Sequence, residues 1–472
     1  MIRANEHDQV QGSTEGRMSR REFVLKAVGA GFAASSVGTL LTACGGGLTT
    51  DQKAQGQSIT MGSSTQGLSK KYSGQTIAVA LAITSAGNSL LKKFTSQTGI
   101  KVKWTVFGWD ALQNKITAAA SADTYFADVT DVDWSRVGLY ARTKWFAPLK
   151  FSDLDTLKKD VPQLDVFTVD GQLVGMPNDA SIMVTTVNTK DFEQAGIEKM
   201  PTTFDAYENA LKDIQKAGVN AHPLGIPFAA AEGLSTYWYQ LTGGAFGGRI
   251  LSDSFEPLFT DKSSAGYRAM EWMVEQYKSG MVPKEYINVT DSSEMQSGMA
   301  LHKLSSIFSD YSGNVSTLYN VPSQSKVTGQ IKYLPTPGEN GIGQNLGNPD
   351  GVGIPVTARR KGAAAQFIKW YTSTETQAKL AGAYGPVETG GIAFPMRLSS
   401  MKILAKNTSA QGAELLELFR DNSRPVFPGG PPPWYPTFSD AVYTNIHSAA
   451  LGQKTVAQAI KEIARTVSKE GD

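Results

Sequence analysis

The sequence predicts an α/β fold, because segments typical of strands alternate along the chain with segments typical of helices. The run Thr76–Ile83 is short and apolar, as a buried strand is. A helical segment with Leu90 and Phe94 on one face follows it, and a second strand is expected at Val102–Phe107. This alternation predicts a parallel sheet covered by helices on both faces. In such sheets ligands bind on the loops that follow the strands.

The composition describes a large globular protein with little net charge. Of 472 residues, 41% are hydrophobic and 19% are charged, and the formal net charge is +2. We expect one to three domains from this length. The sequence has no basic stripe that would indicate a nucleic-acid partner. Its single cysteine excludes an intrachain disulfide, and its four histidines do not follow a metal-binding spacing. We therefore expect no metal and no cofactor.

The first 75 residues are expected to lie outside the fold. Arg20 and Arg21 belong to a segment, SRREFVLK, that resembles a twin-arginine export motif. An apolar stretch follows and ends in Leu-Thr-Ala-Cys44, which resembles a lipobox, the site at which a signal is cut and the cysteine acylated. We expect residues 1–43 to be an export signal and Cys44 to carry lipid. The stretch is too short and too interrupted for a membrane-spanning helix. Residues 44–75, rich in Gly and Ser, are expected to form a flexible tether.

A central stretch, residues 171–218, carries the most specific pattern. It contains an apolar extended run at Ser181–Val187, a short helix at Asp191–Ala195 and a longer helix with Phe204 and Tyr207 on its apolar face. Thr202 is expected to cap the longer helix. The positions that match a family pattern are Gly175, Pro177, Asn188, Lys190, Phe192, Ala195, Gly196, Ile197, Pro201, Thr203, Phe204 and Asp205.

These residues resemble the sugar-binding branch of the bacterial extracellular solute-binding proteins, the branch similar to maltodextrin-binding protein. The resemblance runs over Thr76–Glu470. It departs from the family at Val187, where Tyr is usual, and at Thr189, which separates Asn188 from Lys190. It implies a two-lobed type II periplasmic-binding-protein fold with three hinge crossings. Lobe 1 would comprise residues 76–181 plus 351–394, and lobe 2 residues 182–350 plus 395–472.

The same resemblance implies a function. The chain is expected to be the lipid-anchored substrate-binding subunit of an ABC importer, not an enzyme, and to deliver a neutral sugar, oligosaccharide or polyol to permease subunits. We expect a monomer on the outer face of the cell membrane or in the periplasm, with no nucleic-acid partner.

Sugar-binding sites combine aromatic rings with carboxylates, so we take aromatic and acidic residues as the candidate ligand-binding residues. Asp131, Asp133 and Trp134 follow a predicted strand, where acids are equally common as helix caps or solvated groups. Trp238 lies in an aromatic cluster that could equally be core. Tyr311, beside Asp310, stands where the resemblance places a sugar-stacking aromatic. The expected ligand-binding residues are Asp131, Asp133, Trp134, Asp179, Trp238, Asp310, Tyr311, Trp109, Glu388 and Trp434.

Two alternatives stay open from the sequence. A surface-anchored glycoside-modifying enzyme would need two apposed carboxylates, such as Asp131 and Glu388, although no positive signal favours it. The same fold could also bind a non-sugar solute. A polyamine would need a carboxylate-rich cleft and a ferric ion paired tyrosines. Because the mature chain is nearly neutral and no adjacent tyrosine pair occurs, both rank below sugars.

Overall fold

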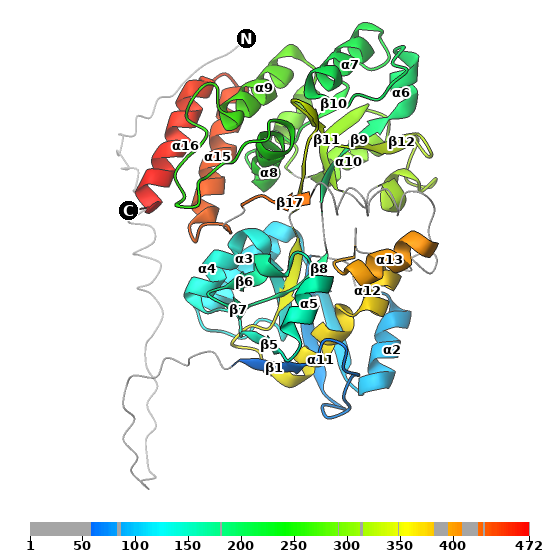
Figure 1. The fold of residues 1–472 in the computed structure, drawn as a ribbon, viewed down its shortest axis with the longest axis vertical. Helices are drawn as coiled ribbons and strands as arrows, with labels where there is room; N and C mark the ends of the chain where they lie inside the picture. Colours follow the sequence, from blue (N-terminus) through cyan, green and yellow to red (C-terminus); the bar gives the residue numbers. More distant parts are fainter. Residues whose placement is uncertain are drawn as a thin grey trace, which may run out of the picture. The chain divides into compact units, whose positions relative to one another are not determined.

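The computed structural model describes residues 58–82, 86–179, 182–290, 292–311, 315–347, 349–381, 395–407, 423–427 and 430–471 (Figure 1). These residues form two separate main sheets, each with its own set of helices. No helix within these ranges combines the length and the apolar character that crossing a membrane requires.

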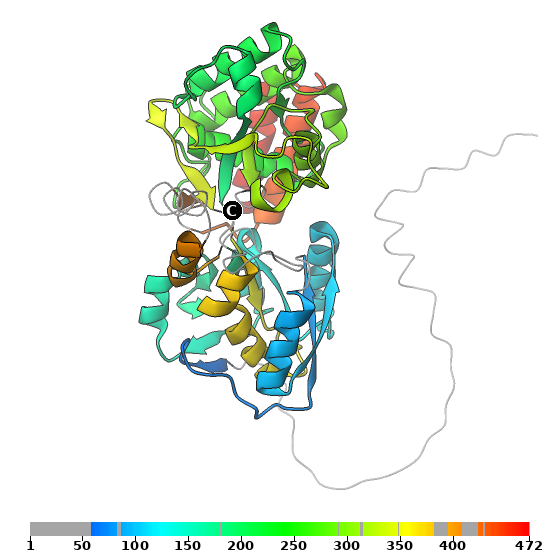
Figure 2. The same cartoon turned by 90° about the vertical axis from the view of Figure 1, so that its right-hand side faces the viewer.

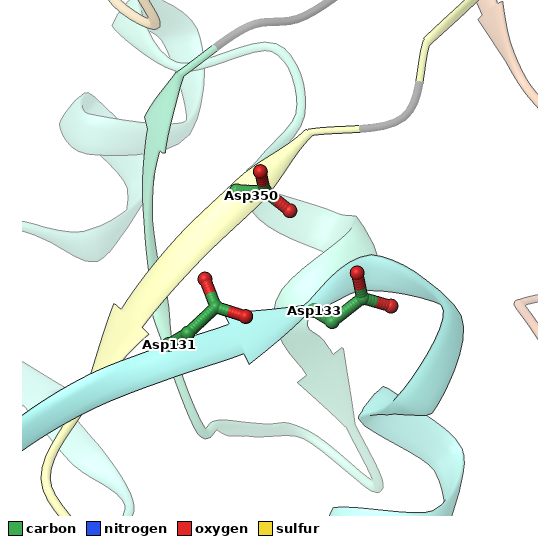
Figure 3. Close-up of side chains that lie close together, drawn as sticks. All are labelled: Asp131, Asp133 and Asp350. Atoms are coloured by element: carbon green, nitrogen blue, oxygen red, sulfur yellow. The ribbon is translucent and has the colours of Figure 1, made fainter. Parts of the chain in front are cut away.

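The first main sheet has five strands in the order β3-β2-β4-β16-β8. Their bounds are β3 (Lys101–Val106), β2 (Thr76–Leu81), β4 (Val129–Asp133), β16 (Asp350–Gly353) and β8 (Met176–Asp179). β2 is parallel to β3 and β4, as expected, but β16 runs antiparallel to both β4 and β8. The sheet is therefore mixed. β4 and β16 lie directly side by side in Figure 3, so that two strands distant in sequence bring their acidic residues together.

Seven helices of the described residues accompany this sheet. They are α2 (Asn88–Thr98), α3 (Trp109–Ser121), α4 (Val137–Thr143), α5 (Leu154–Asp160), α11 (Lys361–Tyr371), α12 (Thr374–Leu380) and α13 (Leu398–Asn407). α2 and α11 lie side by side (Figure 2), and Phe94 of α2 packs on Phe367 and Trp370 of α11 with ring centroids 5.7 and 4.9 Å apart. Phe94 thus occupies the buried face that the sequence predicted for this helix.

The second main sheet has four strands in the order β10-β11-β9-β12. Their bounds are β10 (Leu224–Gly225), β11 (Ser306–Tyr311), β9 (Met183–Asn188) and β12 (Ile331–Leu334). β9 is the strand expected in the central stretch. It is buried along its whole length and runs antiparallel to both β11 and β12. A strand buried on both faces explains why its sequence is a continuous apolar and β-branched run.

The helices of the second sheet are α6 (Thr189–Gln194), α7 (Phe204–Lys216), α8 (Glu232–Gln240), α9 (Ala265–Ser279), α10 (Ser292–Ala300), α15 (Tyr435–Ala450) and α16 (Val456–Gly471). The cap of α7 is Thr203, whose hydroxyl accepts from the Ala206 amide at 3.3 Å, and the expected cap at Thr202 is wrong by one residue. Phe204 and Tyr207 of α7 pack on Phe308 of β11 at 5.7 and 5.6 Å. The predicted apolar face of α7 therefore covers this sheet.

Short elements complete the fold. The 3₁₀ turns are η1 (Trp134–Arg136), η2 (Leu164–Phe167) and η4 (Lys284–Asn288), and the π turns are η3 (Leu241–Ala245) and η5 (Val315–Tyr319). Four two-stranded ladders pair β1 (Ile59–Gly62) with β5 (Leu149–Phe151), β6 (Thr168–Val169) with β7 (Gln172–Leu173), β13 (Pro337–Gly338) with β14 (Gly341–Ile342), and β15 (Asn345–Gly347) with β17 (Ser423–Pro425).

In the order of the described elements, the chain goes from one sheet's elements to the other's three times. The first passage connects β8 to β9, the second connects β15 to β16, and the third connects α13 to β17. This connectivity is the one expected from the sequence for a two-lobed fold with three crossings. It also means that each sheet is built from chain segments that are distant in sequence.

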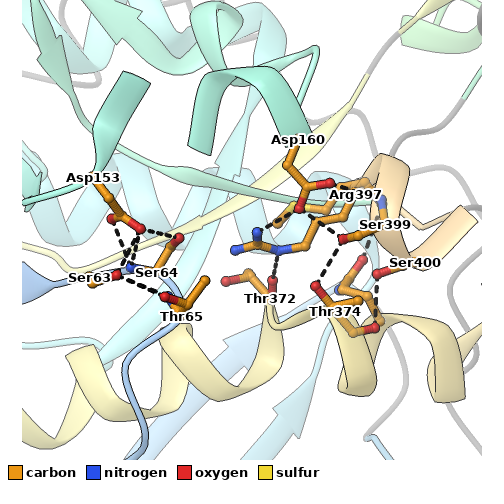
Figure 4. Close-up of polar contacts among 12 residues, drawn as sticks. Ser63, Ser64, Thr65, Asp153, Asp160, Thr372, Thr374, Arg397, Ser399 and Ser400 are labelled. Atoms are coloured by element: carbon orange, nitrogen blue, oxygen red, sulfur yellow. Dashed lines mark hydrogen bonds and ion pairs between the residues drawn. The ribbon is translucent and has the colours of Figure 1, made fainter. Parts of the chain in front are cut away.

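The expected tether, residues 44–75, is folded in its second half, and that expectation is wrong from residue 58 onward. Ile59–Gly62 pairs in parallel with β5, and Met61 is buried. Asp153 accepts hydrogen bonds from the hydroxyl of Ser63 at 2.8 Å and from the amide of Ser64 at 2.8 Å (Figure 4). Sequence alone missed this strand because four residues are too short for a periodicity to be recognised.

Residues 395–407, which were expected in lobe 2, pack on elements of the first sheet instead. Arg397 donates from Nη1 to Asp160 of α5 at 2.9 Å and from Nε to the carbonyl of Thr372 at 2.6 Å (Figure 4). The hydroxyl of Ser400 donates to the carbonyl of Thr374 at 2.8 Å. These contacts fasten α13 to α12, so the third passage lies after α13, between it and β17.

Asp128, at the start of β4, joins three elements of the first sheet. Its fully buried carboxylate accepts from the amides of Ala78, Arg359 and Arg360 at 3.0, 3.0 and 2.9 Å. The hydroxyl of Tyr125 donates to it at 3.2 Å. Three backbone donors from β2 and from the turn before α11 depend on this one side chain.

We expect Asp128→Ala to lower the free energy of unfolding by about 3 kcal/mol or more, because it leaves buried amide groups without an acceptor. Urea titration followed by tryptophan fluorescence measures this change. Glu271→Ala, which removes an exposed carboxylate from α9, is the matched control and should change stability by less than about 0.5 kcal/mol. Equal losses in the two variants would contradict the structural role of Asp128.

Candidate functional site

A cavity of about 510 Å³ is lined by residues from both sheets and their helices. Its lining residues are Gly108, Trp109, Ala111, Asp133, Trp134, Ser135, Met183, Pro227, Ala231, Glu232, Gly233, Thr236, Tyr237, Thr290, Met295, Ser309, Tyr311 and Asp350. The first sheet provides Asp133 and Asp350, at the end of β4 and the start of β16. The second sheet provides Ser309 and Tyr311 from β11. Polar groups and aromatic rings from the elements of both sheets therefore line the same cavity.

The end of β4 positions the first group of side chains. Asp133 caps η1, since its carboxylate accepts from the Ser135 amide at 2.9 Å. The same carboxylate accepts from Nε1 of Trp109 at 3.1 Å and lies 3.5 Å from Nη1 of Arg136. The Arg136 guanidinium in turn lies over the ring of Trp109, 4.5 Å from its centroid. Asp133 thus holds the ring of Trp109 and the guanidinium of Arg136 in position.

Strand register creates a cluster of acids beside this group. Asp350 of β16 lies opposite Asp133 of β4 on one side and Asp179 of β8 on the other. Asp131 lies two residues before Asp133 on the same face of β4, and carboxylate oxygens of Asp131, Asp133 and Asp350 lie within 4.8 Å of one another (Figure 3). Like charges at such a distance repel unless a positive charge lies among them. The spacing suits a shared proton, a metal ion or an ammonium group of a ligand.

Burial and mutual repulsion perturb the titration of this cluster. Burial, and secondarily the charge of Asp133, raise the pKa of Asp131 to about 8. Its carboxylate accepts from Nε2 of Gln113 at 2.7 Å, and Gln113 in turn accepts from the hydroxyl of Tyr140 at 2.7 Å. Burial and the charges of the neighbouring aspartates also raise the pKa of Asp350 well above its ordinary range. The cluster therefore favours protonation or a bound cation.

A fourth acid, Glu232, begins α8 on another wall of the cavity. Burial raises its pKa, while the charge of Arg136 and hydrogen bonds from Tyr435 and Ser439 oppose that shift. Ser439 donates to it at 2.8 Å, and the hydroxyl of Tyr435 donates to its other oxygen. An acid in the first turn of a helix also interacts favourably with the helix dipole.

A second, larger cavity of about 910 Å³ borders the first at Trp134. Its lining includes Val137, Val166 and Val169 from the first sheet's side, together with Phe427 and prolines of the segment before α15. Its walls contain the charged residues Arg142, Asp165, Asp170 and Arg424, but they lack the acid cluster. The smaller cavity therefore carries the chemistry of the site.

The model of one family, the bacterial extracellular solute-binding proteins, matches residues 89–390. The chain belongs to this family. A curated relative of this solute-binding protein is the diacetylchitobiose-binding protein DasA of Streptomyces coelicolor, 28% identical over 213 residues, which are 43% of this chain and 44% of the relative. The chain thus matches less than half the length of that relative.

Solved structures of other proteins share the fold. The maltose-bound MalE3 of T. maritima has a TM-score of 0.70 at 22% identity, covering 84% of this chain and 100% of that one. A solute-binding protein from Agrobacterium vitis S4 with bound D-mannitol has a TM-score of 0.68 at 22% identity, covering 84% and 98%. One from Agrobacterium radiobacter K84 in complex with ribitol has a TM-score of 0.70 at 20% identity, covering 84% and 99%. These similarities confirm the two-lobed type II fold expected from the sequence.

Four of the residues expected in the site line the cavity of this solute-binding protein. They are Trp109, Asp133, Trp134 and Tyr311. Trp109 and Tyr311 are half-buried, so their rings are the ones accessible to a ligand. Trp134 is only 6% exposed, because its ring stacks on Phe427 at 6.2 Å and contacts Tyr435 at 5.7 Å. Asp131 is not among the lining residues, although one of its carboxylate oxygens lies within 4.8 Å of oxygens of Asp133 and Asp350.

Two of the expected residues are buried structural groups, and the structure corrects them. Trp238 is fully buried, donates from Nε1 to the carbonyl of Gly266 at 2.7 Å and packs on Phe259. One helical step of about 100° separates it from Tyr237, which does line the cavity, so Trp238 is directed toward α9 instead.

Asp310 is also fully buried. It accepts from the hydroxyls of Thr186 and Tyr319, each at 2.7 Å, from Nε2 of Gln296 at 3.0 Å and from the Tyr311 amide at 2.7 Å. Four donors saturate a carboxylate, so Asp310 holds β9, α10, β11 and η5 together and leaves ligand binding to its neighbour Tyr311.

The other expected residues lie outside the cavity lining. Asp179 is buried in β8 opposite Asp350. Trp434 is buried against Phe255 and Phe438, with ring centroids 5.9 Å from each, so it packs on the body of the protein and not against the cavity. Glu388, Cys44, Arg20 and Arg21 lie outside the described residues.

Sequence analysis missed Glu232, Asp350 and Ser309. Glu232 precedes the aromatic cluster of α8 and could have been noted as an acid in a first helical turn. Asp350 carries no local signal, because its importance comes from pairing with strands some 170 and 217 residues earlier in the chain. Ser309 likewise depends on which face of β11 reaches the cavity.

The raised pKa of Asp131 predicts a pH-dependent stability. Between about pH 4 and pH 8 the native state keeps a proton that the unfolded chain loses, so the free energy of unfolding falls as pH rises, by up to about 1.4 kcal/mol per pH unit. Asp131→Asn removes this titration and retains the acceptor for Gln113. We expect its urea-unfolding free energy to exceed that of the parent at about pH 8 and to approach it at about pH 4.

The control is Asp213→Asn, at an exposed position of α7, which should retain the pH dependence of the parent protein. If Asp131→Asn also retained that slope, the assigned titration of Asp131 would be wrong.

Proposed function

We propose that this solute-binding protein is the substrate-binding subunit of an ABC importer, and that it captures a sugar, oligosaccharide or polyol in the 510 Å³ cavity. The observation that carries this proposal is the composition of the cavity walls. Half-buried aromatic rings of Trp109 and Tyr311 face the same space as the carboxylates of Asp133, Glu232 and Asp350. Aromatic faces cover the C–H faces of a sugar, and carboxylates accept hydrogen bonds from its hydroxyls.

The arrangement of these groups over two layers supports a capture mechanism. Trp109 and Asp133 come from the first sheet's side, and Glu232 and Tyr311 come from the second. A ligand held by both sets favours the conformation in which the two sets are close, because it stabilises that state more than a state in which only one set makes contact. That conformation would be the one that permease subunits recognise, and the chain would act on them as a monomer.

Named relatives support the ligand class. The proteins with similar folds are described with maltose, D-mannitol and ribitol, and the curated relative is described as binding diacetylchitobiose. A thermal-shift screen over such sugars and polyols tests the proposal, because a ligand that binds only the folded state raises the melting temperature. Calorimetry then gives the affinity, and recovery of the ligand unaltered tests the further proposal that the chain is not an enzyme.

For the ligand found in this screen, we expect Tyr311→Ala to weaken binding by roughly 1–3 kcal/mol, because a half-buried stacking aromatic is lost from the cavity wall. Isothermal titration calorimetry measures the change. Tyr443→Ala on α15, a partly buried tyrosine outside the cavity lining, is the matched control and should leave the affinity unchanged. An unaltered affinity in Tyr311→Ala would reject the stacking role.

The family consists of extracellular proteins, and we further propose how this chain is exported and retained. Arg20 and Arg21 would direct export as a twin-arginine signal, and Cys44 would carry the lipid after cleavage. Several acyl chains on one cysteine bind a membrane far more firmly than one. The folded body begins by residue 58, so only a short segment would connect it to the membrane surface.

We expect Cys44→Ser to move the protein from the membrane fraction to the soluble fraction of the producing cell, because the substitution removes the thiol that would be acylated. Immunoblotting of fractions before and after detergent extraction measures the distribution. A cysteine-to-serine protein that still required detergent for its release would contradict lipid anchoring at this residue.

A further inference from the structure

The cavity that we propose for sugar binding is acidic. Asp133, Glu232 and Asp350 line it, Asp179 lies opposite Asp350 in the sheet, and an oxygen of Asp131 lies within 4.8 Å of oxygens of Asp133 and Asp350. Within the described residues, its lining includes no Lys, Arg or His. The nearby cation, Arg136, is engaged with Asp133 and with the ring of Trp109. Among the three clustered aspartates, Asp133 alone forms an ion pair with a base in the described part of the chain.

We propose that the ligand carries a protonated amine, and that this ammonium group binds at the carboxylates of Asp133 and Asp350, with Asp131 as the third acceptor. The ligand class is thus an amino sugar or amino-polyol rather than the neutral sugar expected from the nearly balanced net charge. This inference rests on the proposed function, because it assigns the substrate class of the same cavity.

The geometry of the acid cluster fits an ammonium group. A tetrahedral nitrogen has three N–H donors, and acceptors at the usual charge-assisted distance of about 2.85 Å would lie about 4.7 Å from one another. The oxygens of Asp131, Asp133 and Asp350 lie within 4.8 Å of one another (Figure 3). The cluster is therefore compact enough for one nitrogen to reach oxygens of all three carboxylates.

Charge balance supports the same assignment. Without a cation, burial and mutual repulsion hold protons on the cluster, as the raised pKa values of Asp131 and Asp350 indicate. An ammonium group would remove this repulsion and make stronger hydrogen bonds than a neutral hydroxyl can.

A separate observation indicates that the cavity holds a polar ring rather than a simple polyamine. Ser309 lines the cavity and is buried, and its hydroxyl has no hydrogen-bond partner within the described residues. A buried hydroxyl without a partner costs free energy that a ligand hydroxyl would recover. The rings of Trp109 and Tyr311 would cover the C–H faces of a sugar, which a flexible polyamine lacks.

The experiment compares three disaccharides that share one β-1,4 framework and differ at C2: the glucosamine dimer, cellobiose and diacetylchitobiose carry an amine, a hydroxyl and an acetamide. A second pair, glucamine and sorbitol, makes the same comparison for polyols. Isothermal titration calorimetry is done on the full mature chain at about pH 6, where the amines are protonated. We expect the amine to bind at least about ten-fold more tightly than its hydroxyl or acetamide analogue.

Equal or tighter binding of the hydroxyl or acetamide compound would overturn the amine inference while leaving the proposed function intact. Failure of all five probes would also overturn it, and the separate screen with maltose, mannitol and ribitol would then decide the proposed function. Calcium chloride is tested as well. If it raises the melting temperature without any sugar and abolishes the preference for the amine, the cluster binds a metal ion and the ammonium site is rejected.

Variants test the residues that we assign. In Asp350→Asn the ratio of amine to hydroxyl affinity should fall toward one, because the cluster loses a charge but keeps its shape. Asp213→Asn, at an exposed position of α7, is the matched control and should retain the ratio of the parent. If Asp350→Asn does not fold, as judged by circular dichroism, Asp133→Asn makes the same test. A ratio that stayed unchanged in a folded variant would overturn the assignment.

Discussion

The antiparallel pairing of β16 with β4 is the constraint on which the site depends. It brings a strand that starts at Asp350 against one that ends at Asp133, so two acids face each other at the edge of the five-stranded sheet. Asp179 of β8 lies opposite Asp350, and Asp131 lies two residues before Asp133 on β4. Like charges opposite one another cost stability. A sheet that keeps several acids together at one edge is typical of a binding site rather than of a structural core.

The surrounding groups show how that cost is limited. Arg136 forms an ion pair with Asp133 and stacks on Trp109, while Gln113 donates to Asp131. These contacts hold the side chains in place but do not neutralise the cluster. Asp128 and Asp310 illustrate the contrast, because each is buried and saturated with donors from several elements. The fold thus uses some buried acids as connectors and leaves others facing a cavity.

Much of the fold could be predicted from local patterns. The strands β2, β3 and β9 and the helices α2 and α7 are predicted by apolar spacing, because each buries apolar side chains against a sheet or a neighbouring helix. The short strand β1 and the packing of α13 could not be predicted. β1 is too brief to show a period, and α13 is fixed by Arg397 through contacts with residues far away in sequence.

The sequence by itself determined the α/β class through its local patterns and the family through a resemblance, and four of its ten candidate ligand-binding residues line the cavity. Tertiary structure decided which of the candidates reach the cavity. Trp238 and Tyr237 are adjacent in sequence, yet only one lines the site, since a helix separates consecutive side chains by about 100°. The tertiary structure also decided the acidity of the cavity. Net charge sums over the whole surface, whereas strand register concentrates charge at one edge of one sheet.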